Sequence, residues 1–284
     1  MVTASSTANP LRHRRLLDEL THAVNRVSST DMRDWGARTA QTYTKVLSRR
    51  TRNLGRTIKG AGDAIAAGAR GTVSAARAGH LRSFLQTSAA AFATRAVTFG
   101  QNVQEGALAL ARVVKENPRE VAPKLLAGSL SFLLVSGGPD ANGGFPDSDI
   151  AIGGIGAHRS LFTHSILGGA FLETLIYSLG DLMEVAHVHL PRDHDPVWDV
   201  IAKHSAGFKK ALAMGAGLGM VVHLGSDGTW QPGTYHGIPI HLPREVHCAI
   251  LDVNAAAEGI DVNKKASPFQ SRRTFRTANA KAPR

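Results

Sequence analysis

The chain reads ALAMGAGLGMVVHLGSD from Ala211 to Asp227, an apolar run that ends with one histidine and one aspartate. Small and aliphatic side chains over this length are typical of a helix buried among other helices. The four-residue spacing of His223 and Asp227 places both on one face of that helix, one turn apart. Because an unpaired polar group in an apolar helix costs about 1–3 kcal/mol, we expect His223 to have a polar partner from elsewhere in the fold.

Two further apolar runs accompany this helix, at residues 125–135 and 166–179. Neither they nor residues 211–224 reach the roughly 20 uninterrupted residues that cross a bilayer, and Glu173 lies inside the second run. The best strand signal is Ile238-Pro239-Ile240, where the proline confines a strand to a sheet edge. The sequence therefore predicts a mainly α-helical protein, a multi-helix bundle with loop-borne metal ligands and little or no β-structure.

Helical spacing of apolar residues also marks other parts of the chain. Such helices are expected at residues 11–29, 31–47, 80–117 and 118–137. Asp31 is expected to cap the second of these, and Pro118 is well placed to start the last. Residues 55–79 are rich in glycine and alanine, and at about 1 kcal/mol per glycine an isolated helix is not expected there.

Charge divides the chain into three parts. The net charge is +11, yet Asp and Glu outnumber Lys and Arg in the middle of the chain. We interpret residues 1–124 as a basic, Ala/Gly-rich helical region with a disordered leader, 125–262 as a helical metal-binding domain, and 263–284 as a basic disordered tail. Basic runs such as Arg12-His13-Arg14-Arg15 and Arg49-Arg50-Thr51-Arg52 either attract nucleic acid or anionic lipid, or are simply solvated surface.

Two features bear on localisation. The first ten residues lack the apolar core of a secretory signal, so no signal peptide is expected. Cys248 is the only cysteine, which excludes an internal disulfide, an Fe–S site and a Cys-rich zinc finger. We expect a cytoplasmic protein, or one bound peripherally to the inner membrane.

Histidine is concentrated in the acidic part of the chain, where all but three of the 13 histidines lie. A Gly/Pro-rich loop carries Asp147 and Asp149, and a turn there can bring both carboxylates to one cation. His158 is expected in a loop or first helical turn, and His164 inside a helix that starts near Ser160. Coordination of one metal ion would satisfy the polar nitrogens of both His164 and His223. Imidazole and carboxylate ligands are typical of zinc or manganese sites.

In this order the motifs resemble the YdjM-like (LexA-regulated, inner-membrane-associated) family of metal-dependent hydrolases. The matching elements are Pro146-Asp147-Ser148-Asp149, the segment from His158-Arg159 to Thr163-His164-Ser165, and His223-Leu224-Gly225-Ser226-Asp227. The resemblance covers about residues 137–245. The spacing between the His-Arg and Thr-His pairs is one residue longer here than is usual in that family, and the family's strongly hydrophobic spanning helices are muted.

The resemblance implies a single site for one or two divalent cations, zinc or manganese. Metal-activated water would attack an ester, with Asp149 or Asp227 as the proton acceptor. Arg159 is expected either to bind an anionic oxygen of the substrate or to form a salt bridge on the helix surface. No nucleotide-binding glycine motif is present, so no organic cofactor is expected. The implied metal ligands are Asp147, Asp149, His158, His164, His223 and Asp227.

Two other groups of histidines call for an interpretation. His187, His189 and His194 lie in what is expected to be a polar loop, where they either bind metal or are ordinary surface side chains. The Gly/Pro-rich stretch 231–243 is a candidate lid over the site, with further histidines in and after it.

Three classes of function stay open. The first is a metal-dependent hydrolase of a small-molecule phosphoester or a lipid ester, with a metal-dependent nuclease as its variant; the acidic site domain and the aromatic content of 6% argue against the nuclease. The second is a membrane-surface-associated protein with a structural metal site, whose basic helices dock on anionic lipid. The third is a helical interaction protein in which the histidines are incidental.

Overall fold

The computed structural model describes residues 10–80, 82–83, 86–87, 114–138, 143–154, 158–230, 234–236 and 241–279. The described part is built from helices and contains no strand, which confirms the predicted fold class. One isolated bridge joins Ser160 to His236. The helices are α1 (Pro10–Arg26), α2 (Ser29–Arg77), α4 (Pro118–Ser136), α5 (Ser148–Gly153), α6 (Ile166–Val188), α7 (Val197–Thr229) and α8 (Arg244–Asn279).

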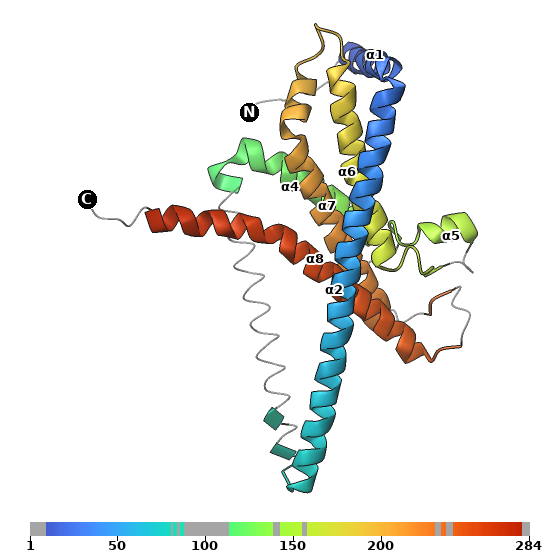
Figure 1. Cartoon of the computed structure of the whole chain (residues 1–284), viewed down its shortest axis with the longest axis vertical. Coiled ribbons are helices and arrows are strands. Elements are labelled where there is room, and N and C mark those ends of the chain that lie inside the picture. Colours follow the sequence, from blue (N-terminus) through green and yellow to red (C-terminus); the bar gives the residue numbers. More distant parts are fainter. Residues whose placement is uncertain are drawn as a thin grey trace, which may run out of the picture.

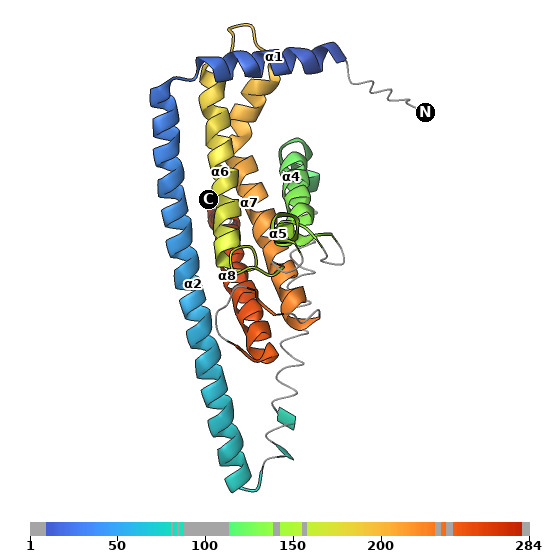
Figure 2. The same ribbon diagram turned by 90° about the vertical axis from the view of Figure 1, so that its right-hand side faces the viewer.

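Helices α6 and α7 run side by side at the centre of the molecule (Figure 2). Helix α4 packs on α7, and α2 packs on α6 from the other side. Helix α8 crosses α2 and also packs on α7 (Figure 1). Helix α1 lies across the α6–α7 turn at the end of the bundle. The resulting fold exposes much of α2 and encloses the apolar α7.

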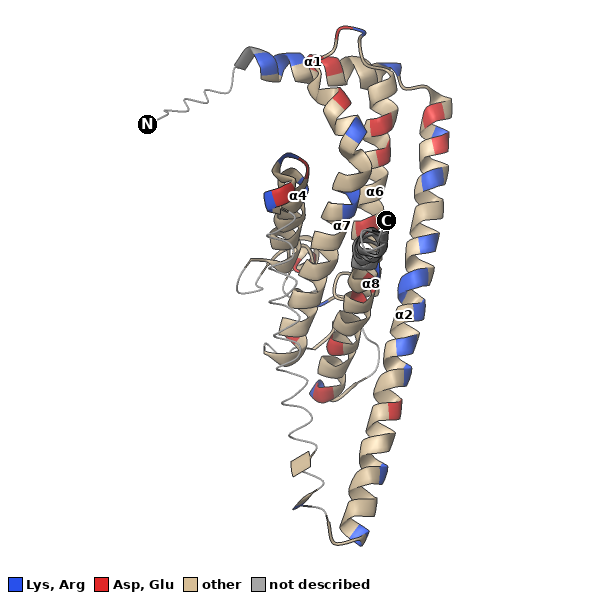
Figure 3. Cartoon of the chain, turned by 90° about the vertical axis from the view of Figure 1, so that its left-hand side faces the viewer, with Lys and Arg blue, Asp and Glu red and all other residues tan. Residues whose placement is uncertain are grey.

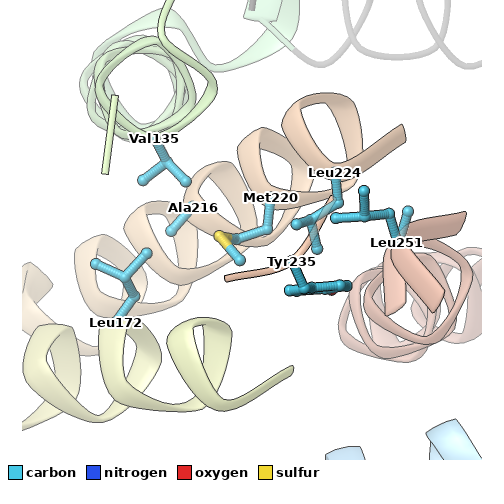
Figure 4. Packing of buried hydrophobic residues seen from close by; sticks show 8 residues of the cluster. Val135, Leu172, Ala216, Met220, Leu224, Tyr235 and Leu251 are labelled. Atoms are coloured by element: carbon cyan, nitrogen blue, oxygen red, sulfur yellow. The ribbon is translucent and has the colours of Figure 1, made fainter. Parts of the chain in front are cut away.

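The apolar core forms where α4, α6, α7 and α8 meet (Figure 4). Its centre on α7 consists of Met220 and Leu224, both 0% exposed. Glycine and alanine bring α4 and α7 close together, because a Cβ on Gly215 would collide with the backbone of Gly128. The apolar run that opens at Ala211 is therefore a buried helix, as its composition predicted. The other core members are Val135, Leu172, Ala216, Tyr235, Leu251 and Ala255.

Helix α2 differs from the expected pair of segments. Ser28 is its N-cap and Asp31 is the third helical residue of a capping box, so the prediction of Asp31 as the cap was wrong. The helix then continues through the Gly/Ala-rich segment to Arg77. Its first half is docked on α6 and α8, and extending an anchored helix costs far less than nucleating an isolated one.

Two other boundaries bear on the predicted domains. Helix α4 ends where expected, with Gly137 in the left-handed conformation at φ 81°. It begins at Pro118 and so runs across the predicted boundary at residue 124. Helix α8 is assigned from Arg244 to Asn279 and so runs across the predicted boundary at residue 262; the disordered tail over residues 263–284 stays a prediction. Most of the helical segment expected at 80–117 lies outside the described residues.

Helix α6 has 23 residues and is long and apolar enough to cross a membrane by length and composition. The apolar run predicted at residues 166–179 lies within this longer helix, which continues to Val188 and is interrupted by Glu173, Asp181 and Glu184. The core helix of a soluble protein has the same properties. In this fold α6 contacts α2, α7 and α1 along its length, and Glu173 within it is ion-paired.

Candidate metal centre

The six predicted ligands lie together at one end of α6. They come from three segments of the chain: the start of α5, where Asp147 is the N-cap and Asp149 lies in the first turn, the α5–α6 loop and the last turns of α7. His164, His223 and Asp227 are 0%, 1% and 3% exposed, so most of the cluster is closed to solvent. Two overlapping groups within it could hold a metal ion, one formed by Asp147, His164 and His223 and the other by Asp149, His158 and His164.

Glycines shape the loop that carries the two aspartates. Gly143 and Gly144 both have φ of +82°, a conformation that side-chain-bearing residues rarely adopt. A Cβ on Gly144 would lie 2.6 Å from the backbone of Val135 and Gly137, so this loop fits tightly against the end of α4. That close contact places Asp147 and Asp149 opposite His223 of α7.

Three imidazoles surround one oxygen of Asp147. Its Oδ1 lies 3.3 Å from His158 Nδ1, 3.4 Å from His164 Nε2 and 3.4 Å from His223 Nε2. On the other side, Asp227 Oδ2 lies 3.3 Å from His164 Nε2 and 3.6 Å from His223 Nε2. Zinc–ligand bonds of about 2.1 Å in tetrahedral geometry separate ligand atoms by roughly 3.4 Å, so these spacings fit a shared cation.

Each carboxylate is held by one oxygen while the other faces the centre of the cluster. Asp147 Oδ2 accepts a hydrogen bond from Gly143 N at 2.6 Å. Asp149 Oδ2 accepts from Ser160 N at 2.8 Å and from Thr163 Oγ1 at 2.7 Å. Asp227 Oδ1 accepts from Arg159 Nη2 at 2.9 Å. These hydrogen bonds orient the second oxygens, Asp147 Oδ1, Asp149 Oδ1 and Asp227 Oδ2, toward the histidines.

Two of the imidazoles are oriented in the same way. His223 Nδ1 lies 3.3 Å from the carbonyl oxygen of Ser136, to which only a protonated nitrogen can donate. This leaves Nε2 of His223 as the ligand atom. His164 Nδ1 lies 3.0 Å from Thr163 Oγ1, and its Nε2 faces Asp147 and Asp227. Such outer hydrogen bonds fix the tautomer and the ring orientation of metal-ligating histidines.

The inward-facing atoms are buried and have no hydrogen-bond partner among the described residues. They are Asp147 Oδ1, Asp149 Oδ1, His158 Nδ1, His164 Nε2, His223 Nε2 and Asp227 Oδ2. An unsatisfied buried polar atom costs about 1–3 kcal/mol, and six at one point are difficult to explain as core packing. A divalent cation would satisfy all of them, and the donor set of imidazoles and carboxylates fits zinc or manganese.

The charge of the cluster also favours a cation. Burial opposes ionisation of Asp147, but the contacts with His164 and His223 hold its pKa far below the usual range. The pKa of Asp149 and that of Asp227 are also lowered, because hydrogen bonds and nearby positive charge outweigh burial. Burial is the main reason that the pKa of His158 is lowered, which favours the neutral ring that a metal ligand requires. The three carboxylates are therefore ionised at neutral pH.

Arg159 has an unusual backbone conformation, with φ of 61° in the left-handed region. This conformation costs about 1–2 kcal/mol for a residue with a Cβ. It turns the guanidinium back to Asp227, at 2.9 Å. Of the two roles expected for Arg159, the structure contains a salt bridge, formed within the cluster rather than on a helix surface.

His164 differs from its predicted place. Helix α6 begins at Ile166, and Ser165 is its N-cap, with its side chain accepting a hydrogen bond from Leu167 N. His164 therefore precedes the helix, and the prediction that it lies inside one was wrong. The physical reason is that Ser160 Oγ bonds to Thr163, forming a turn that holds the chain out of helical conformation before Ser165.

Several supporting residues were not predicted from the sequence. Besides the backbone of Ser136 and Gly143, Tyr235 donates its hydroxyl to the carbonyl oxygen of His164, and His247 Nδ1 accepts from the backbone N of Tyr235 at 3.1 Å. Both are buried. Residues 234–236 of the candidate lid are thus attached to the site loop, and the rest of the stretch to residue 240 lies outside the described residues.

The second histidine group lies at the opposite end of α6. His187 is in the last turn of that helix, and His194 is in the α6–α7 loop, where both contact Asp199 of α7. His189 contacts Asp31 of α2 instead. The prediction of a polar loop is thus correct for His194 but wrong for His187, which extends the apolar helix by its last turn.

Comparison of the chain with protein-family models, curated proteins and solved structures found no match. The family resemblance of the sequence motifs thus stays a prediction. The arrangement of the buried side chains is the basis for inferring a function.

Proposed function

We propose that this protein is a metal-dependent hydrolase of phosphoesters or lipid esters. The observation that carries the proposal is the convergence of three carboxylate oxygens and three imidazole nitrogens, buried and without hydrogen-bond partners, within 3.3–3.7 Å contacts of one another. Purely structural polar clusters normally pair their buried atoms. A site that leaves its inward atoms open is suited to hold an ion.

The ligands divide into a deep and a more open part. His164, His223 and Asp227 are the deep part, with side chains at most 4% exposed, and Asp147 joins them to His158, whose side chain is 23% exposed. This set accommodates one or two zinc or manganese ions. When bound, such an ion supplies Lewis acidity and lowers the pKa of a coordinated water molecule toward neutrality.

We assign Asp149 as the proton acceptor. Its Oδ2 is held by Ser160 and Thr163, so its Oδ1 has a fixed position beside His158 at the open side of the cluster. A general base needs such a fixed position near the attacking oxygen. Asp227 was the other candidate, but its inward Oδ2 faces the deep ligands His164 and His223. Its Oδ1 accepts from Arg159, which we assign as a positioning residue for that carboxylate.

The surroundings of the cluster favour a substrate with an apolar part. Ile150 and Ile152 on α5, and Leu161 and Phe162 in the following loop, are exposed large apolar side chains on the segments that carry the ligands. Exposed apolar groups gathered beside a site are typical of contact with a lipid or an apolar ligand. A lipid ester or a phospholipid is therefore the substrate class that these residues support best.

The first experiment is elemental analysis of the purified wild type and of the His164→Ala and Asp147→Ala variants. We expect one or two equivalents of zinc or manganese at this centre in the wild type, and loss of these tightly bound equivalents in both variants. His241→Ala removes an exposed histidine from the same region and is the matched control, with unchanged metal content. A wild type that binds no metal after addition of zinc and manganese would contradict the proposal.

Hydrolysis is tested separately with phosphodiester and phospholipid substrates. Asp149→Asn is expected to retain metal and lose at least tenfold in the rate of hydrolysis, because proton transfer by a positioned base contributes about 10²–10⁴-fold. Metal binding without hydrolysis of either substrate class would leave a structural metal site and overturn the enzymatic part of the proposal.

A second candidate function is that of a membrane-surface protein whose metal site is structural. It is favoured by the Lys and Arg residues spread along α2 (Figure 3), which match a cationic contact with anionic lipid. Leu126, Leu130 and Leu134 are exposed on α4, on the other side of the α6–α7 pair, and offer a separate apolar surface. Sedimentation with phosphatidylglycerol vesicles at low and high salt tests this candidate; duplex DNA in the same assay tests the nuclease alternative.

A further inference from the structure

We infer that His187, His194 and Asp199 form a second site for a divalent transition metal, distinct from the candidate metal centre, that ties together the two ends of the α6–α7 turn. The three residues come from the last turn of α6, the connecting loop and the first turn of α7. They could hold a metal ion, since their ligand atoms all lie within 4.8 Å of one another. Two imidazoles and one carboxylate are a donor set typical of zinc.

The geometry of the trio is specific. His187 Nε2 lies 2.9 Å and His194 Nε2 lies 3.1 Å from the same oxygen, Asp199 Oδ1. The two rings meet edge to face, with centroids 5.6 Å apart and planes at 76°. Both Nε2 atoms therefore point at one place from different directions, as ligands around a small cation do.

The tautomer of His194 strengthens this inference. Its Nδ1 lies 2.7 Å from the carbonyl oxygen of Pro191, and because a carbonyl only accepts, this nitrogen carries a proton. In the neutral ring, Nε2 then presents a lone pair to the carboxylate of Asp199. A carbonyl that accepts from the outer nitrogen is the usual support of a metal-ligating histidine.

Two imidazole nitrogens contact the same oxygen, Asp199 Oδ1, and a shared cation would hold all three atoms. Without metal, each imidazole must be protonated at Nε2 to donate to the same oxygen. One divalent ion shared by the three side chains would take the place of these protons, with a lone pair from each Nε2 and one carboxylate oxygen as its ligands.

The loop is held in place by α1, so the ligands are positioned without help from an ion. Arg12 donates to both oxygens of Asp195, at 3.0 and 3.1 Å. Glu19 accepts from the backbone N of Asp195 at 3.0 Å and from Trp198 Nε1 at 2.8 Å. A preorganised loop loses less conformational entropy when it binds a ligand.

The two sites are separate in space. The candidate metal centre lies before the start of α6, and the His187, His194 and Asp199 site includes the last turn of that helix. A 23-residue helix of about 33 Å therefore lies between them. The side chains of the second site are also more exposed, at 29%, 19% and 63% for His187, His194 and Asp199. We therefore expect it to bind zinc more weakly than the buried cluster and to exchange it faster.

The test is calorimetric titration of the full chain with zinc. The wild type is expected to bind one more equivalent than His194→Ala and Asp199→Asn, whereas His164→Ala keeps that equivalent and loses the tighter binding. His189→Ala is the matched control, because it removes a histidine of the same turn that contacts Asp31 rather than Asp199; its stoichiometry should equal that of the wild type.

Each outcome is informative. Equal zinc stoichiometry and affinity in the wild type, His194→Ala and Asp199→Asn would overturn the second site and leave an ordinary imidazole–carboxylate ion pair. Circular dichroism of each variant establishes that it is folded, and the isosteric Asp199→Asn guards against a loss of structure in the alanine variant. A thermal transition raised by zinc in His164→Ala, and not in a His164→Ala and Asp199→Asn double variant, would independently support the site.

Discussion

Two buried polar clusters lie between the helices of this protein, and they differ in how their charges are paired. In the first, Arg49 and Arg50 of α2 meet Glu173 of α6 and Glu258 and Asp261 of α8. In the second, which is the candidate metal centre, aspartates face histidines and six inward atoms have no hydrogen-bond partner among the described residues. The first cluster contains its own cations, the two arginines, whereas the side chains of the second could hold a metal ion.

The arginine cluster pairs its positive and negative side chains with one another. Arg50 is 2% exposed, with Nη2 2.9 Å from Glu173 and with Glu258 against its other amino group. Burial alone would lower the pKa of Arg50, but the three carboxylates raise it above its usual value, so it stays charged. This network explains how a charged residue is tolerated in the apolar helix α6, and it fixes α2 and α8 to that helix.

The largest expected effect comes from breaking the arginine cluster. Arg50→Met removes the buried cation that contacts Glu258 and one of the two arginines that contact Glu173. Removing one partner of a buried ion pair costs about 3–5 kcal/mol in the free energy of unfolding. Urea denaturation measures this loss. Arg52→Met on the same helix is the control, because Arg52 is exposed. A loss below about 1 kcal/mol for Arg50→Met, similar to that of the exposed control, would mean that the network contributes little.

Metal removal should destabilise the protein mainly through the candidate metal centre. At free zinc about 100-fold above its dissociation constant, a ligand specific to the folded state contributes about 2.7 kcal/mol. We expect a chelator to remove this contribution from the wild type and to have no comparable effect on Asp147→Asn. Equal sensitivity of the two proteins to the chelator would show that the stabilising ion lies elsewhere.

A smaller effect is expected from the hydrogen bonds that orient the ligands. Thr163 donates to Asp149 and lies beside Nδ1 of His164, so Thr163→Val should weaken zinc affinity by about 10–100-fold, as for other outer-shell residues of metal sites. Competition with a chromophoric chelator measures the affinity. Thr174→Val, a buried α6 threonine that bonds only to the backbone of its own helix, should leave it unchanged.

The smallest effect concerns Glu19, whose carboxylate belongs to a third, ion-paired group at the α1 end of the bundle. Burial raises its pKa, but Arg15, the Asp195 backbone and Trp198 together lower it below the usual value. A lowered folded-state pKa stabilises the protein above the unfolded value of about 4.3, and this contribution is lost as pH falls through the folded pKa.

We therefore expect Glu19→Gln to cost about 1 kcal/mol in unfolding free energy at pH 7, and the difference from the wild type to shrink as the pH falls below about 4. Asp18→Asn, at an exposed neighbouring position, is the control. A difference that grows on acidification would reverse the sign of the assigned pKa shift.

The fold and the candidate ligands differ in how far they could be predicted from local pattern. The apolar periodicity of α4 and α7 predicted both helices, and the i, i+4 spacing of His223 and Asp227 predicted their shared face. The run Arg49-Arg50-Thr51-Arg52 was interpreted as surface or as a polyanion contact, yet Arg50 is buried. A usable signal was present in Glu173, since a carboxylate in an apolar helix requires a cationic partner.

Local sequence determined the helices, the turns at Gly137 and Gly143, and the supply of imidazoles and carboxylates, because periodicity, backbone conformation and ligand chemistry are properties of residues close together in the chain. Tertiary structure alone decided which charges meet. Arg50 lies more than a hundred residues from Glu173, and His164 and Asp227 come from different segments of the bundle. The ion pairs of the arginine cluster and the unpaired inward atoms of the candidate metal centre both follow from how α2, α6, α7 and α8 pack. Residues that are distant in sequence come into contact only through this packing.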